Sequence, residues 1–129
     1  MKTLIMGLLA TLCTLIGCKT TAEGYKSLSV TDFEKAISNK NVVRLDVRTA
    51  EEFAEGHIAN AINIDVLKSD FESNALKVLP KDKTIAVNCR SGKRSKNAAA
   101  ILAKHGYKII ELDPGYNGWV SAGKPVTKQ

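Results

Sequence analysis

Apolar residues along the chain follow two spacings, one typical of strands and one typical of helices. Short runs rich in β-branched residues predict strands, which we place at 42–47, 58–64, 84–88 and 108–112. Apolar positions three and four residues apart predict helices at 32–39, 49–56, 71–78, 96–105 and 116–122. Strands alternate with helices, which indicates βαβ units. We therefore expect an α/β fold with a mainly parallel central sheet of about five strands and helices on both faces.

The sequence before these elements has the pattern of an export signal. Lys2 supplies a positive charge, and residues 4–16 are apolar but too few to span a bilayer comfortably. The stretch Leu15-Ile16-Gly17-Cys18 resembles the lipobox of bacterial lipoproteins, which implies cleavage before Cys18 and lipid on its sulfur. An ordinary secretory signal with a chance cysteine is the alternative, and the order apolar, apolar, Gly, Cys favours lipidation.

These features divide the chain into three parts. We expect residues 1–17 to be a signal peptide, residues 18–26 to be the lipidated cysteine with a short polar tether, and residues 27–129 to be one domain. More than one acyl chain gives stable anchoring, at about 0.8 kcal/mol per buried CH₂. The expectation is an exported, membrane-anchored lipoprotein of the cell envelope, which faces the periplasm in a Gram-negative cell.

Composition limits the partners and cofactors to be expected. The chain has 129 residues, a formal net charge of +6, three cysteines and two histidines, which suits a single domain with its own core. Its basic residues are spread out and do not interleave with aromatics, so nucleic acid is not an expected partner. Removal of Cys13 and lipidation of Cys18 would leave Cys89 as the one free thiol. We therefore expect no internal disulfide, no metal site and no cofactor.

Cys89 lies at a predicted strand-to-helix corner. Main-chain N–H groups at the start of a helix lack internal partners, and the helix dipole there favours negative charge. Arg90, Lys93 and Arg94 add three cationic side chains, and Gly92 can adopt the positive φ that lets the chain curl back. A buried, inert cysteine is the alternative. Because the flanking residues are polar and basic, the sequence favours a reactive thiolate at Cys89.

Three stretches, in this order, resemble the signatures of single-domain rhodanese-like proteins, the thiosulfate sulfurtransferase family. The first is Leu45-Asp46-Val47-Arg48 with Glu52-Phe53, Gly56-His57-Ile58 and Ala61-Ile62-Asn63-Ile64, the second is Cys89-Arg90-Ser91-Gly92-Lys93-Arg94-Ser95, and the third is Gly115-Tyr116-Asn117-Gly118-Trp119. The resemblance covers residues 27–122 and implies a rhodanese-like α/β domain. The family commonly has Gly, Pro and Gly at three turn positions where this chain has Asn60, Asp65 and Pro114.

The resemblance implies a sulfurtransferase that carries sulfane sulfur on Cys89 as a persulfide. Small sulfur-containing anions such as thiosulfate are the implied donors, and cyanide or a thiol, small or on a protein, is the implied acceptor. The loop residues would bind the donor: Arg90, Ser91, Gly92, Lys93, Arg94 and Ser95. A persulfide or redox-relay module that mainly docks a partner protein is the alternative. A cysteine phosphatase is more distant, because phosphatases need Cys-x₅-Arg and Cys89 to Arg94 is Cys-x₄-Arg.

Five other residues receive structural interpretations. We expect Asp46 and Arg48 to form a buried ion pair, and Trp119 to lie in the core. His57 belongs to the Gly-His-Ile stretch and is expected to be structural, since a thiolate held by main-chain amides needs no base. His105 falls in the last turn of a predicted helix, where a cation suits the helix dipole.

Overall fold

The computed structural model describes residues 20–129, so the predicted signal peptide (1–17) and Cys18 lie outside the described residues. Between residues 20 and 129, none of the helices combines the length and the apolar character needed to cross a membrane.

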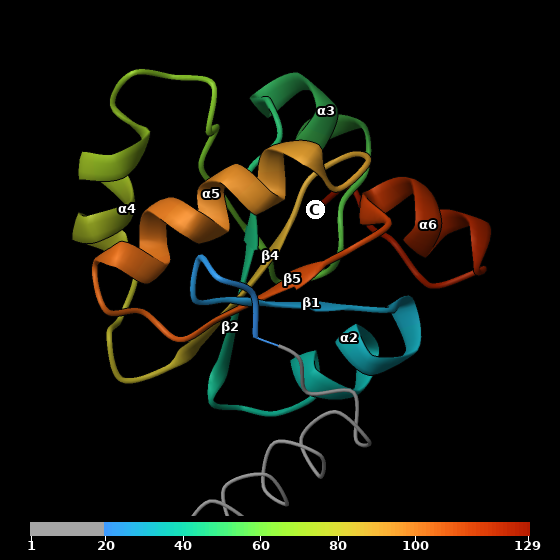
Figure 1. Cartoon of the computed structure of the whole chain (residues 1–129). Helices are drawn as coiled ribbons and strands as arrows, with labels where there is room; N and C mark the ends of the chain where they lie inside the picture. The colour runs from blue at the N-terminus through green and yellow to red at the C-terminus, as the bar shows by residue number, and fades with distance from the viewer. Residues whose placement is uncertain (1–19) are drawn as a thin grey trace, which may run out of the picture.

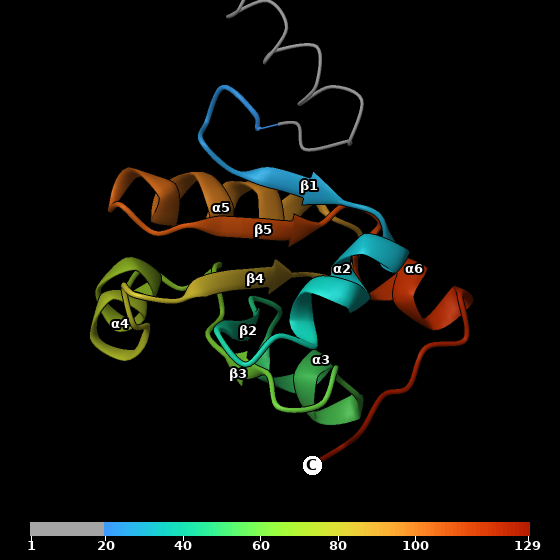
Figure 2. The same ribbon diagram turned by 90° about the horizontal axis from the view of Figure 1, so that it is seen from below.

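Five strands form one all-parallel sheet in the order β1-β5-β4-β2-β3. They are β1 (Lys26–Leu28), β2 (Val42–Asp46), β3 (Ile62–Asn63), β4 (Thr84–Asn88) and β5 (Ile109–Leu112). Figure 2 shows β1, β5 and β4 side by side with their arrows pointing the same way. The predicted α/β architecture is confirmed. Because all the strands are parallel, their carboxyl ends lie at one end of the sheet, and Cys89 directly follows central strand β4 there.

Helices cover both faces of the sheet, as predicted (Figure 1). α4 (Phe71–Val78) and α5 (Lys93–Lys104) pack on one face, and α2 (Val30–Ile37) and α6 (Gly115–Ser121) pack on the other. α3 (Ala50–Glu55) buries no residue of its own. It lies beside the loop that joins β4 to α5, so its polar side chains can reach that loop.

The two faces of β4 contribute to two apolar clusters. Val87 and Cys89 point toward α5 and pack with Leu102 among other residues. Ala86 points to the other face, into a cluster with five further buried residues: Phe33, Ile37, Ile58, Leu112 and Trp119. Trp119 is 2% exposed and its ring meets that of Phe33 edge-on at 6.3 Å, which confirms that it belongs to the core.

Most element boundaries lie within one residue of the prediction, and three elements differ more. α2 begins at Val30 because the Ser29 side chain accepts the N–H of Asp32 and caps the helix. α5 begins at Lys93 instead of 96, which extends the helix into the predicted donor-binding loop. The strand predicted at 58–64 is only the two-residue edge strand β3. The turn before β3 contains Asn60 at a φ of +66°, where the family commonly has Gly.

The chain enters the fold earlier than the sequence indicates. Thr21 donates its N–H to the carbonyl of Tyr25 at 2.7 Å, and the Tyr25 side chain lies in the larger apolar cluster. Lys26 then begins β1, a strand that the sequence does not predict. β1 has three residues and is held by main-chain hydrogen bonds to β5, so it is too short to show an alternation of apolar and polar side chains in the sequence. The predicted tether is therefore folded from residue 20 onward.

Candidate active site

The loop after β4 folds back on the Cys89 sulfur. Cys89 is fully buried, and its Sγ accepts a hydrogen bond from the N–H of Gly92 at 3.1 Å. Gly92 has a φ of +99°, and a Cβ there would lie 2.0 Å from the carbonyl oxygen of Asp113. Only glycine fits both the conformation and the space. The curl predicted at Gly92 is therefore present, and it aims a main-chain donor at sulfur.

The first residues of α6 hold the same loop in place. The N–H groups of Tyr116 and Asn117 donate to the carbonyls of Cys89 (2.8 Å) and Arg90 (3.0 Å). Gly115 has a φ of +67°, and a Cβ on it would lie 2.4 Å from the Arg90 carbonyl oxygen. The Gly-Tyr-Asn-Gly-Trp stretch therefore supports the position of the loop through main-chain contacts.

Glu52 of α3 binds two of the three predicted loop cations. Arg94 donates to both of its carboxylate oxygens, at 2.7 and 3.0 Å, and one Arg90 nitrogen lies 3.5 Å from it. The hydrogen bonds from Arg94 hold the pKa of Glu52 at about 2 and raise the pKa of Arg94 in turn. Arg90 keeps 62% of its side chain exposed, and Lys93 and Ser91 are exposed as well. The loop is therefore less cationic than the sequence indicates.

In the sequence, Glu52 belongs to the first signature stretch and stands three residues after Thr49, the spacing of a capping box. The box forms, because the Thr49 side chain accepts the Glu52 N–H and the Glu52 carboxylate accepts the Thr49 N–H. The second role of Glu52, as the partner of Arg94, joins residues 42 positions apart. No local pattern reveals a contact of that separation.

A second buried network lies on the α5 side of Cys89. The Ser95 hydroxyl is 3.4 Å from Cys89 Sγ and 2.6 Å from a carboxylate oxygen of Glu111, a fully buried residue of β5. Lys96 lies 3.1 Å from Glu111 and 2.8 Å from Asp113. Burial lowers the pKa of Lys96, but the hydrogen bonds that Lys96 donates to these two carboxylates, together with their negative charge, outweigh burial and leave that pKa above its usual value. Glu111 is a glutamate inside an apolar strand. This feature of the sequence indicates a buried acidic residue, but the residues of the Cys89 loop alone do not reveal it.

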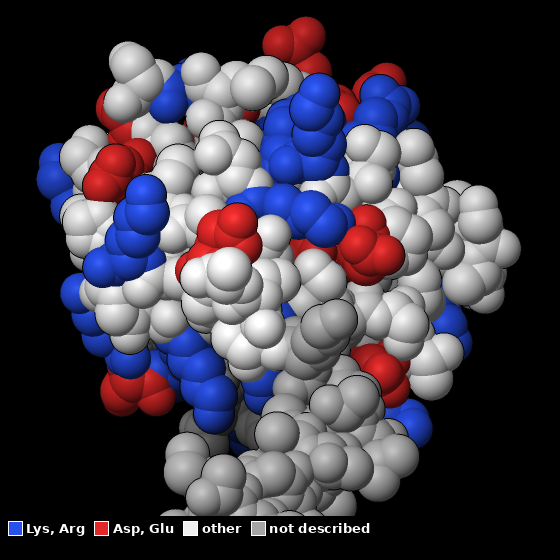
Figure 3. Space-filling model, in the orientation of Figure 1, with Lys and Arg blue, Asp and Glu red and all other residues white. Residues whose placement is uncertain are grey.

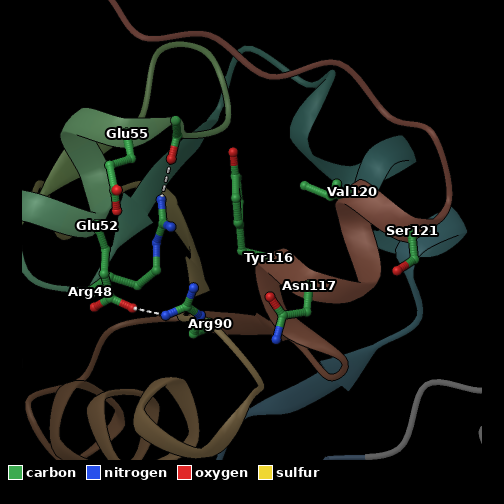
Figure 4. A pocket seen from close by; sticks show the side chains of 9 residues that line it. Arg48, Glu52, Glu55, Arg90, Tyr116, Asn117, Val120 and Ser121 are labelled. Atoms are coloured by element: carbon green, nitrogen blue, oxygen red, sulfur yellow. Dashed lines mark hydrogen bonds and ion pairs between the residues drawn. The ribbon is translucent and has the colours of Figure 1, made fainter.

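A cavity of about 340 Å³ opens beside Arg90 (Figure 4). Tyr116 stands between Arg48 and Val120, and the Arg48 guanidinium lies 4.1 Å from the centre of its ring. Arg48 is held by Asp46 at 2.8 Å, with both side chains almost fully buried, which confirms the predicted ion pair. Nine residues line the cavity: Arg48, Glu52, Glu55, Gly56, Arg90, Tyr116, Asn117, Val120 and Ser121.

The two histidines lie apart from the sulfur. The ring nitrogens of His57 are 2.7 Å from the carbonyl oxygen of Phe53 and 3.1 Å from that of Gln129, and the ring stacks on Phe53. This placement agrees with a structural role. His105 is the C-cap residue of α5, as expected, and pairs with Glu72.

Charges on the surface are mixed in sign. Basic and acidic side chains alternate over the face seen in Figure 3. Within residues 20–129, no three His, Cys, Asp or Glu side chains come together as a metal site would require.

Known proteins resemble this chain in sequence and in fold. The rhodanese-like domain family matches residues 29–122. A protein named sulfurtransferase from Allochromatium vinosum is 30% identical over 94 residues, which cover 72% of this chain and 85% of that protein. The mitochondrial protein HIGH ARSENIC CONTENT 1 of Arabidopsis thaliana is 38% identical over 61% of this chain, and the match spans only 53% of that protein's length.

A solved structure has a similar overall fold. The crystal structure of a rhodanese-related protein from Thermoplasma volcanium matches with a TM-score of 0.72 and 35% identity, over 81% of this chain and all of that one. The parallel sheet, the Cys89 loop at its carboxyl end and the family match over most of the chain agree with one another. The chain belongs to the rhodanese-like domain family.

Proposed function

We propose that this chain is a sulfurtransferase that carries a sulfane sulfur on Cys89. The observation that carries the proposal is the setting of the Cys89 sulfur, at the carboxyl end of β4 with the Gly92 N–H aimed at it. A relative named sulfurtransferase supports the reaction class. Thiosulfate is the donor that we favour, and a thiol or cyanide is the acceptor.

The reaction consists of two displacements at sulfur. In the first, the Cys89 thiolate attacks the outer sulfur of thiosulfate, the S–S bond of the donor breaks, and its electron pair leaves with sulfite. Cys89 then holds the transferred sulfur as a persulfide. In the second, a nucleophilic acceptor attacks the outer sulfur of the persulfide, and the Cys89 thiolate is released. Splitting one transfer into two steps is the usual advantage of a covalent carrier.

The loop suits the charges that appear in these steps. Thiosulfate, sulfite and the ionised persulfide are all anions. The N–H of Gly92 is a fixed donor to the sulfur. α5 begins at the next residue, and the N–H groups of its first turn have no partner within the helix. Arg90, which is 62% exposed and only loosely paired, and Lys93, which is also exposed, are the loop cations available to attract a donor. Arg94 is committed to Glu52 and instead holds α3 against the loop.

The residue at position 95 does not support the phosphatase alternative. A Cys-x₅-Arg pattern would need arginine at position 95. This chain has Ser95 there, buried and in contact with the Cys89 sulfur and with Glu111.

A relay that docks a partner protein has one observation in its favour. Two large apolar side chains follow the carboxyl ends of strands, where Cys89 also lies: Leu67 is 67% exposed and Val120 is 48% exposed. A partner protein that donates or accepts the persulfide sulfur would bind by burying these two side chains. Faster transfer to a protein thiol than to cyanide, lost on Leu67→Ser, would favour the relay over turnover of free thiosulfate.

Intact-mass analysis tests the sulfurtransferase proposal. The purified protein should gain the mass of one sulfur atom on incubation with thiosulfate and lose it when cyanide is added. Cys89→Ser should gain none while keeping the thermal unfolding midpoint of the wild type, because serine nearly matches the shape of cysteine. A sulfur adduct on the serine variant, or none on the wild type, would refute the assignment.

We also propose, from the sequence of residues 15–18 alone, that the protein is an exported lipoprotein anchored through Cys18.

A further inference from the structure

The Ser95 hydroxyl has more acceptors than protons. A hydroxyl carries one proton, and two acceptors surround this one: a Glu111 carboxylate oxygen at 2.6 Å and the Gly92 carbonyl at 3.2 Å. The Cys89 thiol in turn donates to the Ser95 oxygen at 3.4 Å. The carboxylate is both the nearest acceptor and the charged one, and charge-assisted hydrogen bonds are the strong ones. The distances therefore assign the Ser95 proton to Glu111.

This assignment decides what the sulfur meets. With its proton directed at Glu111, the Ser95 oxygen presents only lone pairs to Cys89, so it can accept a bond from a thiol but cannot donate one to a thiolate. The Gly92 N–H, 3.1 Å from the same sulfur, has the opposite preference. The Ser95 oxygen therefore favours the thiol form of Cys89, and the Gly92 N–H favours the thiolate form.

Glu111 does not depend on Ser95 for its own hydrogen bonds. Its other oxygen accepts from the Ser27 hydroxyl of β1 at 2.5 Å and from Lys96 at 3.1 Å. A variant that lacks the Ser95 hydroxyl therefore does not leave the buried carboxylate unpaired, which would otherwise be costly.

We propose that Glu111 is a positioning residue that sets the direction of the Ser95 hydroxyl and, through it, favours the thiol form of Cys89 against the thiolate form that the Gly92 N–H favours. Glu111 touches neither the sulfur nor a substrate, and it acts through Ser95 alone. The inference deepens the proposed function, on which its importance for transfer rests.

Other charges near this network must be accounted for in any pH experiment. Lys96 of α5 faces Glu111. Tyr25, which precedes β1, is also close to Glu111: burial is the larger cause that raises the pKa of Tyr25, and the negative charge of Glu111 raises that pKa further. Arg94 interacts with Cys89 at longer range, and Asp113 lies beyond Lys96. Changing Asp113 removes a carboxylate from Lys96 without touching Ser95, so Asp113→Asn is a matched control for Glu111→Gln.

The test is the pH dependence of alkylation at Cys89 in the full chain, with iodoacetamide as the probe and the Cys89 peptide followed by mass spectrometry. Glu111→Gln should lower the pH of half-maximal alkylation by about one unit, because a neutral amide holds the hydroxyl less strongly. Asp113→Asn should leave it within about 0.3 unit. An unchanged midpoint in Glu111→Gln, or an equal shift in both variants, would overturn the proposal.

A double variant tests the route through Ser95. Ser95→Ala removes the acceptor for the thiol proton and should lower the midpoint, and Ser95→Thr, which keeps a hydroxyl, should restore it. Adding Glu111→Gln to Ser95→Ala should cause less than half the shift that it causes alone. A full shift in the double variant would mean that Glu111 acts through space, contrary to the proposal.

The serine variants preserve the test if Glu111→Gln fails to fold. In that case an unchanged or raised midpoint in Ser95→Ala would overturn the proposal. Alkylation needs no sulfur donor, so this result is independent of whether the protein transfers sulfur.

Discussion

At the scale of single residues, the site depends on carboxylates as much as on the cysteine and its cations. Glu52 neutralises Arg94 and contacts Arg90, and Glu111 binds Ser95 and Lys96. The cysteine, the loop and its glycine are all evident in the sequence, because they are neighbours along the chain. Their acidic partners come from α3 and β5, so only the folded structure brings them into contact.

Glu52 provides a pH-dependent test of this arrangement. Its pKa of about 2 lies below the ordinary value of 4.5, so the ionised form stabilises the folded state. That stabilisation is complete above about pH 4.5 and disappears as the pH falls through about 2. Glu52→Gln should lower the free energy of unfolding by about 1 kcal/mol at pH 7, and by much less at pH 2.

Urea unfolding at the two pH values measures the difference. Glu51→Gln is the matched control, because Glu51 lies in the same first turn of α3 but forms no ion pair within residues 20–129. Equal losses in the two variants at pH 7 would contradict the role assigned to the Arg94 contact.

At the scale of elements, the central part of the fold is predictable and its margins are not. β4 and α4 begin and end where the sequence predicts, because their apolar patterns are continuous and α4 is followed by Pro80. α5 starts earlier than predicted, since its first turn is polar and its N-cap is Gly92 with a positive φ. β1 and β3 are short, and main-chain pairing with a neighbouring strand defines them more than side-chain pattern does.

The turn that supports the Cys89 loop can be tested by adding one methyl group. Gly115→Ala places a Cβ against the Arg90 carbonyl at a φ of +67°, whereas Gly123→Ala adds the same group at +74° with no atom within 4 Å. We expect a cost of about 1 kcal/mol for Gly123→Ala, from the backbone conformation alone.

Gly115→Ala should cost about 2–4 kcal/mol and slow sulfur loading of Cys89, because the main-chain clash displaces the loop. Chemical denaturation gives the first quantity, and the rate of mass gain with thiosulfate gives the second. Similar costs for the two variants would mean that the loop is free to move away from α6.

At the scale of the whole molecule, the proposed anchor has a direct test. Cys18→Ser should shift the protein from the membrane fraction to the soluble fraction, because the lipid would have no attachment site. Cys13→Ser changes a cysteine of the same segment and should leave the protein in the membrane fraction. Membrane recovery of Cys18→Ser equal to that of the wild type would contradict lipidation at this residue.

The direction of β1 has a consequence for how the protein would face its surroundings. The chain joins the sheet at the amino end of β1, and Thr20 folds back beside Lys26 there. Since β1 and β4 run parallel, Cys89 lies at the opposite end of the sheet. A bilayer that held the protein by the segment before residue 20 would therefore lie nearer the opposite end of the sheet from Cys89, so that the loop around Cys89 would face the aqueous compartment.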